Sequence, residues 1–331
     1  MKVAVIPRAN EIRLVEVAIP AVRPEEVLLR VSICGICGSD VDVWRGNKLK
    51  QYPYSPGHEF CGVIEQIGTG VHGIHVGQRV VVDPNLNCGE CVVCQKGMPN
   101  LCDELKSRTG KSNGGLAEYA VVNRRMVYLL PERLPDTLAP FIEPLSCALH
   151  VADVAGTRTD QPVVIFGAGL LGVLTGLVLK DRRAKVVFVE PVEGRRERIR
   201  RCLGLSAVPP ATLSPAGGQI GFEIAIDCSG SPDAIAEAIR VLRKAGRLVL
   251  GGVVRGTPSL DASLSDVTRK ELELRGAWLN PHTFPGAVAL AVTYESVLAC
   301  LETETFSLDR VHDAFERAKD HNAPKVLVTA L

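Results

Sequence analysis

The sequence has 331 residues, which is enough for two domains, because folded domains usually contain about 100 to 200 residues. Its 38 Lys and Arg residues nearly balance its 37 Asp and Glu residues, and the resulting net charge of +1 argues against a nucleic-acid partner and against an anionic membrane surface. With 46% hydrophobic and 23% charged residues, the composition is that of a folded globular protein and not of a disordered one.

The sequence carries no pattern that directs it to or through a membrane. Residues 1–17 alternate apolar and polar side chains, which is typical of a strand and unlike a secretory signal. The longest uncharged stretch, 163–179, is slightly shorter than a membrane-spanning helix and contains four glycines. We therefore expect no transmembrane segment and a cytoplasmic location.

Residues 1–143 predict a β-rich domain, because short apolar strands alternate there with Gly and Pro residues. No internal repeat or low-complexity tract interrupts the pattern, so we place the end of this domain where the pattern changes. The expected strands cover residues 3–6, 12–17, 25–33, 61–68, 78–84 and 116–122.

The pattern changes over residues 144–280, where strands alternate with helical stretches, as in a parallel sheet with crossover helices. Residues 281–331 contain one amphipathic stretch, 308–320, and one terminal strand, 325–331, which is too little for a third core. We therefore predict the α/β class and expect this last segment to return to the first domain. The expected strands of the parallel sheet cover residues 163–166, 185–190, 223–228, 247–252 and 272–279.

A first group of potential metal ligands consists of CGICGSD at residues 34–40 and Gly-His-Glu at 57–59. A thiolate, an imidazole and a carboxylate from separate loops make an incomplete zinc shell, whose last position can admit water or a substrate oxygen. Alone, a His-Glu pair is usually an ordinary surface feature and a cysteine in a strand usually belongs to the core. Their occurrence together favours a catalytic metal site.

A second group is the array C-x2-C-x2-C-x7-C formed by Cys88, Cys91, Cys94 and Cys102. Four thiolates within one loop can complete a tetrahedral zinc shell, which leaves no position for a substrate and indicates a structural site. Seven of the eleven cysteines lie between positions 34 and 102, and this crowding favours metal ligation over disulfides. Unrelated cysteines, a redox centre and an iron–sulfur site are the alternatives, and the metal-like gaps with turn-forming Gly and Pro residues favour zinc.

A dinucleotide-binding loop is predicted where GAGLLG follows the strand VVIF. Gly167 permits the turn, Gly169 lets the backbone approach a pyrophosphate, and Gly172 lets the helix pack closely on the strand. Leu170 and Leu171 lie at the helix start, where backbone amides meet phosphates.

An acid at the end of the second parallel strand supports this prediction. Glu190 lies 18 residues after Gly172, close to the spacing of a carboxylate that binds the adenosine ribose. Such a group repels a 2′-phosphate, which favours NAD over NADP. Arg195, Arg196 and Arg198 follow it; they suit a phosphate clamp, but the solvated face of a helix is the simpler interpretation.

In this order the motifs CGICGSD, PGHEFCGVIEQIG, the four-cysteine lobe, FIEPLSCALH and GAGLLG resemble the zinc-dependent medium-chain alcohol and polyol dehydrogenases. The resemblance covers nearly the whole chain. It implies a GroES-like catalytic domain made of residues 1–143 and 281–331, and a Rossmann domain with a doubly wound parallel sheet over 144–280 that binds NAD. It also implies a homodimer or a homotetramer.

The resemblance implies a ligand set for the catalytic zinc. Cys37 and His58 take the place of two ligands, and either Glu59 or Glu143 supplies the remaining protein ligand. A carboxylate at position 143 is similar to the sorbitol and polyol branch, because simple alcohol dehydrogenases have a cysteine there.

Further roles follow from the same resemblance. Ser39 is expected to pass the substrate proton, and Asp40 to orient His58, as a hydroxyl and a carboxylate are chemically suited to do. Two positions depart from the family pattern: Asp42 replaces a common relay histidine, and Leu279 replaces the substrate-binding arginine of animal sorbitol dehydrogenases. These departures argue against sorbitol itself as the substrate.

On the cofactor side, the resemblance places Arg195 along the adenine, and Cys228 and Gly230 in a turn that borders the cofactor. We predict an NAD-dependent oxidoreductase with two zinc ions per chain that acts on a small secondary alcohol: a polyol, sugar or cyclitol. An amino-alcohol dehydrogenase of the threonine or aminocyclitol type is the alternative. A non-enzymatic zinc-thiolate redox protein or nucleic-acid module is more remote, and the net charge of +1 argues against the latter.

Overall fold

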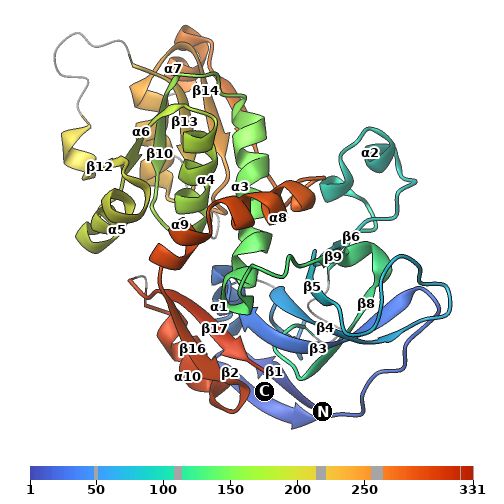
Figure 1. Cartoon of the computed structure of the whole chain (residues 1–331). Helices are drawn as coiled ribbons and strands as arrows, with labels where there is room; N and C mark the ends of the chain where they lie inside the picture. Colours follow the sequence, from blue (N-terminus) through green and yellow to red (C-terminus); the bar gives the residue numbers. More distant parts are fainter. Residues whose placement is uncertain (48–50, 108–113, 214–220, 255–263, 321, 331) are drawn as a thin grey trace. The chain divides into compact units, whose positions relative to one another are not determined.

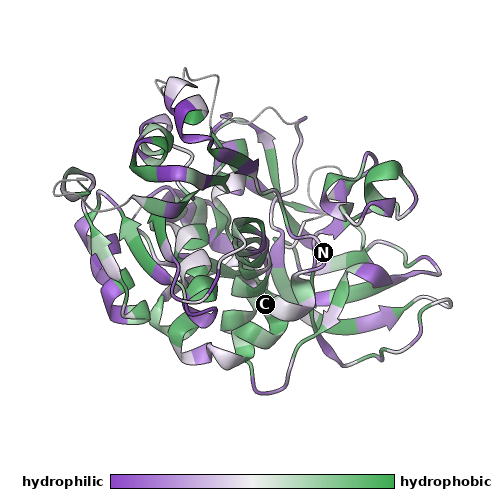
Figure 2. Cartoon of the chain, turned by 90° about the horizontal axis from the view of Figure 1, so that it is seen from above, coloured by the Kyte–Doolittle hydropathy of each residue, from purple (hydrophilic) through white to green (hydrophobic). Residues whose placement is uncertain are grey.

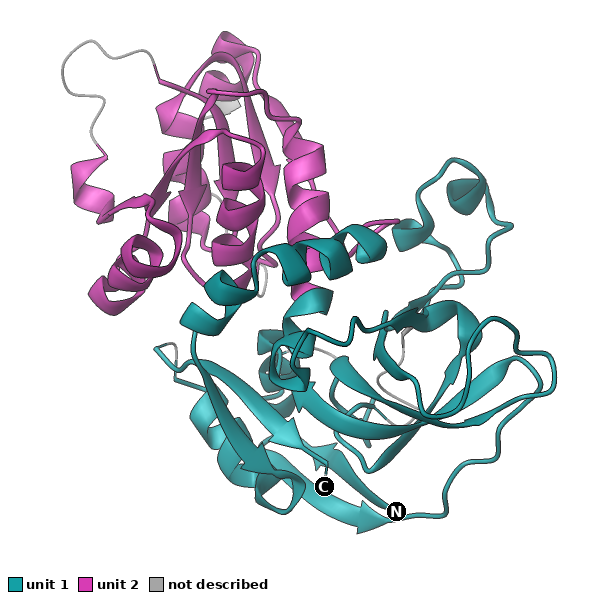
Figure 3. Ribbon diagram, in the orientation of Figure 1, with its two compact units in different colours: residues 1–143, 284–331 teal, residues 144–283 magenta. Residues whose placement is uncertain are grey.

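The computed structural model divides the chain into two compact units (Figure 3). Unit 1 comprises Met1–Glu143 and Phe284–Leu331, and unit 2 comprises Pro144–Thr283. Both ends of the chain belong to unit 1. The structure describes every residue except 48–50, 108–113, 214–220, 255–263, 321 and 331.

Unit 1 is built on a mainly antiparallel sheet (Figure 1). Its strands are β1 (Lys2–Arg8), β2 (Glu11–Glu16), β3 (Glu26–Gly35), β4 (Glu59–Ile67), β5 (Arg79–Val82), β6 (Asn85–Leu86), β7 (Lys106–Ser107), β8 (Tyr119–Asn123), β9 (Val127–Leu129), β16 (Thr303–Ser307) and β17 (Lys325–Thr329). The main sheet has the order β16-β17-β3-β4-β5-β9, with β8 also paired to β3. Strands β1 and β2 form one two-stranded sheet, and β6 and β7 form another.

The register of β3 places the loops of the candidate metal site. Gly35, the last residue of β3, lies opposite Glu59 of β4 on one side and opposite Leu327 of β17 on the other. The chain then passes directly from β3 through Cys37 into a helix. Three segments that are distant in sequence therefore meet at the end of β3.

Helix α10 of unit 1 packs against this sheet through a small apolar face, whereas no residue of α2 is buried. In α10, Val311, Ala314 and Phe315 are buried, and Phe315 packs edge-on against Trp44 with ring centroids 5.6 Å apart. The helices are α1 (Gly38–Trp44), α2 (Val92–Gln95), α8 (Phe284–Thr293), α9 (Glu295–Cys300) and α10 (Val311–Ala318), with the 3-10 turns η1 (Pro99–Leu101), η2 (Arg124–Met126), η3 (Asp136–Phe141) and η5 (Leu308–Arg310).

Unit 2 contains a six-stranded sheet in which every strand pair is parallel. The strands are β10 (Pro162–Phe166), β11 (Lys185–Val189), β12 (Ser206–Val208), β13 (Phe222–Asp227), β14 (Leu242–Leu250) and β15 (Glu273–Gly276). Their order is β12-β11-β10-β13-β14-β15, so the strand order reverses between β10 and β13, as in a doubly wound dinucleotide-binding sheet. The predicted fold class, a β-rich domain with a parallel-sheet Rossmann domain, is confirmed.

The helices that accompany this sheet differ in polarity: α4 consists mostly of apolar residues, whereas α5 is rich in Arg and Glu, and both hydrophobic and hydrophilic helical segments are visible in Figure 2. Helix α5 ends at Leu203, and Gly204 follows it as a left-handed C-cap with a φ of 64°. One helical stretch among the described residues, Asp136–Ala155, is long and apolar enough to cross a membrane, but 72% of its apolar segment is buried, as in a core helix. The helices are α3 (Ile142–Ala155), α4 (Leu170–Asp181), α5 (Glu193–Leu203), α6 (Pro232–Val241) and α7 (Leu264–Lys270), with the 3-10 turn η4 (Pro210–Thr212).

Candidate active site

Asp40 organises the loops around the first group of metal ligands. Its side chain is fully buried and accepts hydrogen bonds from the backbone N–H of Cys37 and of Gly57, each at 3.2 Å. Its Oδ1 also lies 3.6 Å from Nδ1 of His58. Asp40 thus contacts the loop before α1 and the loop before β4, and it lies where a carboxylate that orients His58 is expected.

Cys37, His58 and Glu59 bring one ligand atom each to within 4.8 Å of one another. Burial alone would lower the pKa of His58, but the negative charges of Asp40 and Cys37 raise it well above its ordinary value. Sulfur, imidazole nitrogen and carboxylate oxygen are ligands that zinc accepts together. The chemistry of this set therefore fits a zinc ion.

Glu143 is the second candidate carboxylate, and it lies in the first turn of α3 with 6% of its surface exposed. Burial raises the pKa of Glu143 to about 7; His58 and Lys325 oppose the shift, and Glu59 adds to it. These charges place Glu143 in one electrostatic cluster with Glu59, but Glu143 is not in the described group of ligand atoms from Cys37, His58 and Glu59 that lie within 4.8 Å of one another.

Lys325 is a member of this cluster that the sequence did not reveal. From the start of β17 its Nζ donates a hydrogen bond of 3.0 Å to the carbonyl oxygen of Ile36 and forms an ion pair with Glu59. Burial would lower the pKa of Lys325, but Glu59 and Cys37 raise it, so the side chain stays protonated. No local signal marks this contact, since its two partners are 266 positions apart.

The residues proposed for proton transfer lie in unit 1, and the position proposed for substrate binding lies in unit 2. Ser39 and Asp42 lie half-buried on α1, three positions apart. Leu279 lies in unit 2, half-buried and with a φ of 56°. The nearby Thr283 is buried and donates its hydroxyl to the Ser146 carbonyl oxygen at 2.8 Å, which ties it to the backbone of α3.

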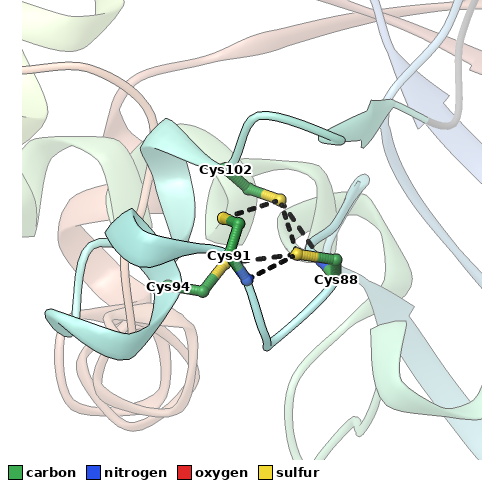
Figure 4. Close-up of side chains that lie close together, drawn as sticks. All are labelled: Cys88, Cys91, Cys94 and Cys102. Carbon is green, nitrogen blue, oxygen red and sulfur yellow. Dashed lines mark hydrogen bonds between the residues drawn. The ribbon is translucent and has the colours of Figure 1, made fainter.

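The four cysteines of the second group converge as a compact cluster (Figure 4). One sulfur from each of Cys88, Cys91, Cys94 and Cys102 lies within 4.8 Å of the others. The Sγ atoms of Cys88 and Cys94, and those of Cys91 and Cys102, are 3.9 Å apart. These positions fit the four-sulfur shell of a structural zinc site.

Backbone N–H groups around the cluster point at the cysteine sulfurs and stabilise their thiolate form. The N–H of Cys91 points to Sγ of Cys88, and the N–H of Cys88 points to Sγ of Cys102, each at 3.3 Å. A hydrogen bond from the backbone of Asp103, with one from Cys94, lowers the pKa of Cys91 to about 7. Donors aimed at sulfur favour the deprotonated form that binds metals.

In unit 2 the glycine-rich loop has the geometry of a phosphate-binding turn. Gly167 has a φ of 95°, and a Cβ at Gly172 would overlap the Gly167 carbonyl oxygen. Gly169, the N-cap of α4, is different, because a Cβ there would meet no atom within 4 Å. Leu170 and Leu171 begin α4 next to this open space, which fits the approach of a pyrophosphate to the helix N-terminus.

Glu190 is fixed beside this loop. It is 2% exposed and accepts hydrogen bonds from the backbone N–H of Ala168 at 2.7 Å and of Val192 at 3.0 Å. Nη1 of Arg195 lies 3.7 Å from its Oε2. Arg196 corrects the expectation of a solvated arginine face, because it is 7% exposed and donates to the Glu190 carbonyl oxygen at 2.6 Å.

A buried acid that the sequence analysis missed shapes the turn after β13. Asp227 is fully buried and accepts hydrogen bonds from the backbone N–H of Ser229 and of Gly230, each at 3.0 Å. The turn also holds Cys228, whose pKa is raised by burial, and Gly230 has a φ of 66°. The position of Asp227 at the end of a predicted strand was the feature of the sequence that could have identified it.

Two known families match the chain in succession. The alcohol dehydrogenase GroES-like domain matches residues 23–132, and the zinc-binding dehydrogenase family matches residues 171–293. The chain is 33% identical to the starvation-sensing protein RspB of Escherichia coli strain K12, with 99% of both proteins covered. It is 26% identical to D-arabinitol dehydrogenase 1 of Uromyces fabae, over 97% of this chain and 95% of that protein.

Solved structures agree with the sequence relatives. The rspB alcohol dehydrogenase of Escherichia coli CFT073, complexed with NADH, has a TM-score of 0.91 and 32% identity over 99% of both chains. A zinc-binding dehydrogenase of Sinorhizobium meliloti 1021, bound to NADP, has a TM-score of 0.90 and 29% identity over 99% of this chain and 98% of that chain. The related structures thus carry both forms of the nicotinamide cofactor.

Proposed function

This chain belongs to the zinc-binding medium-chain dehydrogenases, and we propose that it transfers a hydride between a small secondary alcohol and NAD. The observation that carries the proposal is the convergence of Cys37, His58 and Glu59, a ligand set with room for a substrate oxygen. The glycine-rich loop of unit 2 supports the cofactor half of the reaction.

Cys37 and His58, together with Glu59 or Glu143, would hold the catalytic zinc, and the four lobe cysteines would hold a structural zinc. When bound, the catalytic ion supplies a Lewis acid that makes the substrate hydroxyl more acidic, and NAD accepts the hydride. Asp40 lies beside Nδ1 of His58, which leaves Nε2 of that ring for the metal.

Ser39 would take the proton that the substrate hydroxyl loses. A serine hydroxyl accepts one hydrogen bond while it donates another, so it can pass a proton outward without storing charge. Asp42 lies three positions further along α1, a spacing that puts both side chains on one helix face. We assign Asp42 the place of the relay histidine that the family commonly has there.

Glu190 would select NAD. Two backbone amides hold its carboxylate beside the glycine-rich loop, where it suits the ribose hydroxyls and repels a 2′-phosphate. Arg195 lies 3.7 Å from this carboxylate. The preference for NAD over NADP therefore depends on whether the negative charge of Glu190 or the positive charge of Arg195 faces the ribose. The related structures with NADH and with NADP make this choice worth measuring.

A polyol, sugar or cyclitol is the proposed substrate class. The carboxylate at Glu143 and the likeness to D-arabinitol dehydrogenase 1 support this class. Leu279 stands in place of the arginine that contacts substrate in animal sorbitol dehydrogenases, so a substrate other than sorbitol is proposed.

The test combines metal content with a substrate panel. Purified protein should contain about two zinc ions per chain and should reduce NAD with one class among alcohols, polyols, cyclitols and amino alcohols. NADP is tested in parallel, and Cys37→Ala serves as the inactive control. Turnover only with amino alcohols would replace the polyol assignment, and oxidation that persists in Cys37→Ala would exclude the proposed zinc site.

A further inference from the structure

Arg196 is a buried charged residue of α5, beside the turn that carries Glu190. It is only 7% exposed. Its Nη1 donates hydrogen bonds to the carbonyl oxygens of Glu190 at 2.6 Å and of Pro191 at 2.7 Å, and its Nη2 forms an ion pair with Glu193. Because burial of a guanidinium is costly unless its N–H groups find acceptors, these contacts are a specific feature of the turn.

The contacts of Arg196 complete the hydrogen bonding of residues 190–192. The Glu190 carboxylate accepts hydrogen bonds from the backbone N–H of Ala168 at 2.7 Å and of Val192 at 3.0 Å. These bonds tie the carboxylate to the glycine-rich loop and to its own turn. Arg196 binds the carbonyl groups of that turn, so the turn is fixed through both its amide and its carbonyl groups.

The Glu190 carboxylate retains acceptor positions for a ligand. A carboxylate can accept about four hydrogen bonds, and the two backbone amides use one position on each oxygen. The remaining positions suit the hydroxyls of an adenosine ribose, whereas a 2′-phosphate would meet the negative charge. This discrimination requires a carboxylate that stays in one orientation.

A neighbouring positive charge makes that orientation important. Nη1 of Arg195 lies 3.7 Å from Oε2 of Glu190, and a guanidinium that reached a 2′-phosphate would favour NADP. Arg196 is different from Arg195, because it is buried and its Nη atoms already bind Glu193 and two carbonyl groups. Its charge is therefore used within the turn.

We propose that Arg196 is a positioning residue that determines the preference for NAD over NADP, because it holds the turn in the conformation that presents Glu190 to the ribose. The inference rests on the proposed function, since it concerns the cofactor of that reaction. Arg196 acts through Glu190 and does not touch the cofactor.

The test measures the binding of NADH and of NADPH to the full chain by nicotinamide fluorescence, without an alcohol substrate. In Arg196→Met, the carbonyl groups of Glu190 and Pro191 lose their donor, while an apolar side chain still fills much of the space. The ratio of NADPH affinity to NADH affinity should rise by about three- to tenfold, mainly through weaker NADH binding. Arg196→Lys keeps the charge and one donor group and should give a smaller rise.

A matched control lies one turn further along α5. Arg200 also binds Glu193, at 3.0 Å, and it donates to the carbonyl oxygen of Ala207 at 2.9 Å. Arg200→Met therefore removes a guanidinium from the same helix and from the same acid, and it should leave the affinity ratio unchanged.

A double variant tests the path of the effect. Because Arg196 acts through Glu190, Arg196→Met should not raise the ratio further once Glu190→Ala is present. A purely structural loss would instead change the binding of both cofactors alike in either background.

Each result decides the inference. An unchanged ratio in Arg196→Met would overturn it, and so would a lower ratio, which would mean that the guanidinium attracts the 2′-phosphate directly. A further rise in the Glu190→Ala background would overturn it as well. If Arg196→Met does not fold, the ratio in Arg196→Lys decides in the same way.

The parent protein separates the two possible failures. A parent that binds neither dinucleotide, or that prefers NADPH, would overturn the proposed NAD specificity together with this inference. A parent that prefers NADH, with an unchanged ratio in the Arg196 variants, would overturn this inference alone.

Discussion

The single buried carboxylate of Asp40 contacts several neighbouring groups. It accepts two backbone hydrogen bonds of 3.2 Å and lies 3.6 Å from the His58 ring. Burial by itself would raise the pKa of Asp40, but His58 and the two amides lower it, so the group stays ionised. A negative charge at Nδ1 holds the ring in the orientation that a metal ligand needs.

We therefore expect Asp40→Asn to weaken the binding of the catalytic zinc by about 10- to 100-fold. The asparagine places an amide N–H where the carboxylate accepted hydrogen bonds, so the loops before α1 and β4 lose one acceptor. Competition with a chromogenic chelator measures the affinity. Asp313→Asn is the matched control, because Asp313 forms an exposed pair with Arg310. Equal zinc affinity in both variants would contradict the positioning role.

Glu190 is held in a similar way at the candidate cofactor site, because its carboxylate accepts hydrogen bonds from two backbone amides. Replacement by alanine should raise the ratio of NADP to NAD turnover efficiency by about tenfold or more, the equivalent of one lost hydrogen bond to a charged group. It should also weaken both cofactors, because the loop loses its two contacts. Steady-state kinetics with each cofactor gives the ratio. Glu197→Ala, which removes an exposed carboxylate from α5, should leave it unchanged.

In the turn between β10 and α4, one glycine is required for folding and another for cofactor binding. A Cβ at Gly172 would overlap the backbone of Gly167, whereas a Cβ at Gly169 would meet open space. Gly172→Ala should therefore destabilise unit 2 by about 3 kcal/mol or more. Gly169→Ala should cost about 1 kcal/mol or less and still weaken NADH, because the new methyl group occupies phosphate space. Thermal unfolding and NADH fluorescence distinguish the two effects, and equal behaviour of the two variants would refute this assignment.

The cysteine lobe contains little regular structure, only α2, η1 and the short β6-β7 pair. Few buried apolar side chains hold it, so a zinc ion would supply much of its stability. Cys94→Ala should remove about one zinc per chain and lower the melting temperature by more than about 4 °C. Elemental analysis and calorimetry test this expectation against Cys147→Ala, which removes a cysteine outside the lobe. A normal zinc content in Cys94→Ala would exclude the four-cysteine site.

Among the secondary-structure elements, strands with a clear run of apolar residues were predictable from the sequence, and elements without a clear hydrophobic pattern were not. The predicted strands at 25–33 and 163–166 correspond to β3, which is rich in Leu, Val and Ile, and to β10, whose central residues are β-branched and apolar. Helix α8 was missed because Pro285 and Gly286 suggest a turn and its apolar residues show no polar face. The cysteine cluster was visible because its members are close in sequence, whereas the contact between Glu59 and Lys325 depends on pairing of β3 with β17.

Across the whole molecule, the two proposed chemistries belong to different units. The candidate metal ligands lie in unit 1, and the glycine-rich loop with Glu190 lies in unit 2. Removal of zinc by a chelator should therefore increase hydrogen exchange in residues 34–47, 51–59 and 88–102 while β10, β11 and α4 remain protected. NADH should still bind the metal-free protein. Loss of protection in unit 2 would show that the metals stabilise both units together.

The sequence order of the units also determines when the site is completed during synthesis. All of unit 2 leaves the ribosome before residues 284–331, and at about 5 to 20 residues per second this last segment takes roughly 2 to 10 s. During that interval β3 has no β17 beside it, and Glu59 has no Lys325. The nascent chain therefore presents a thiol, an imidazole and a carboxylate without its cationic partner, so a metal ion that arrives before translation ends would meet the site without Lys325.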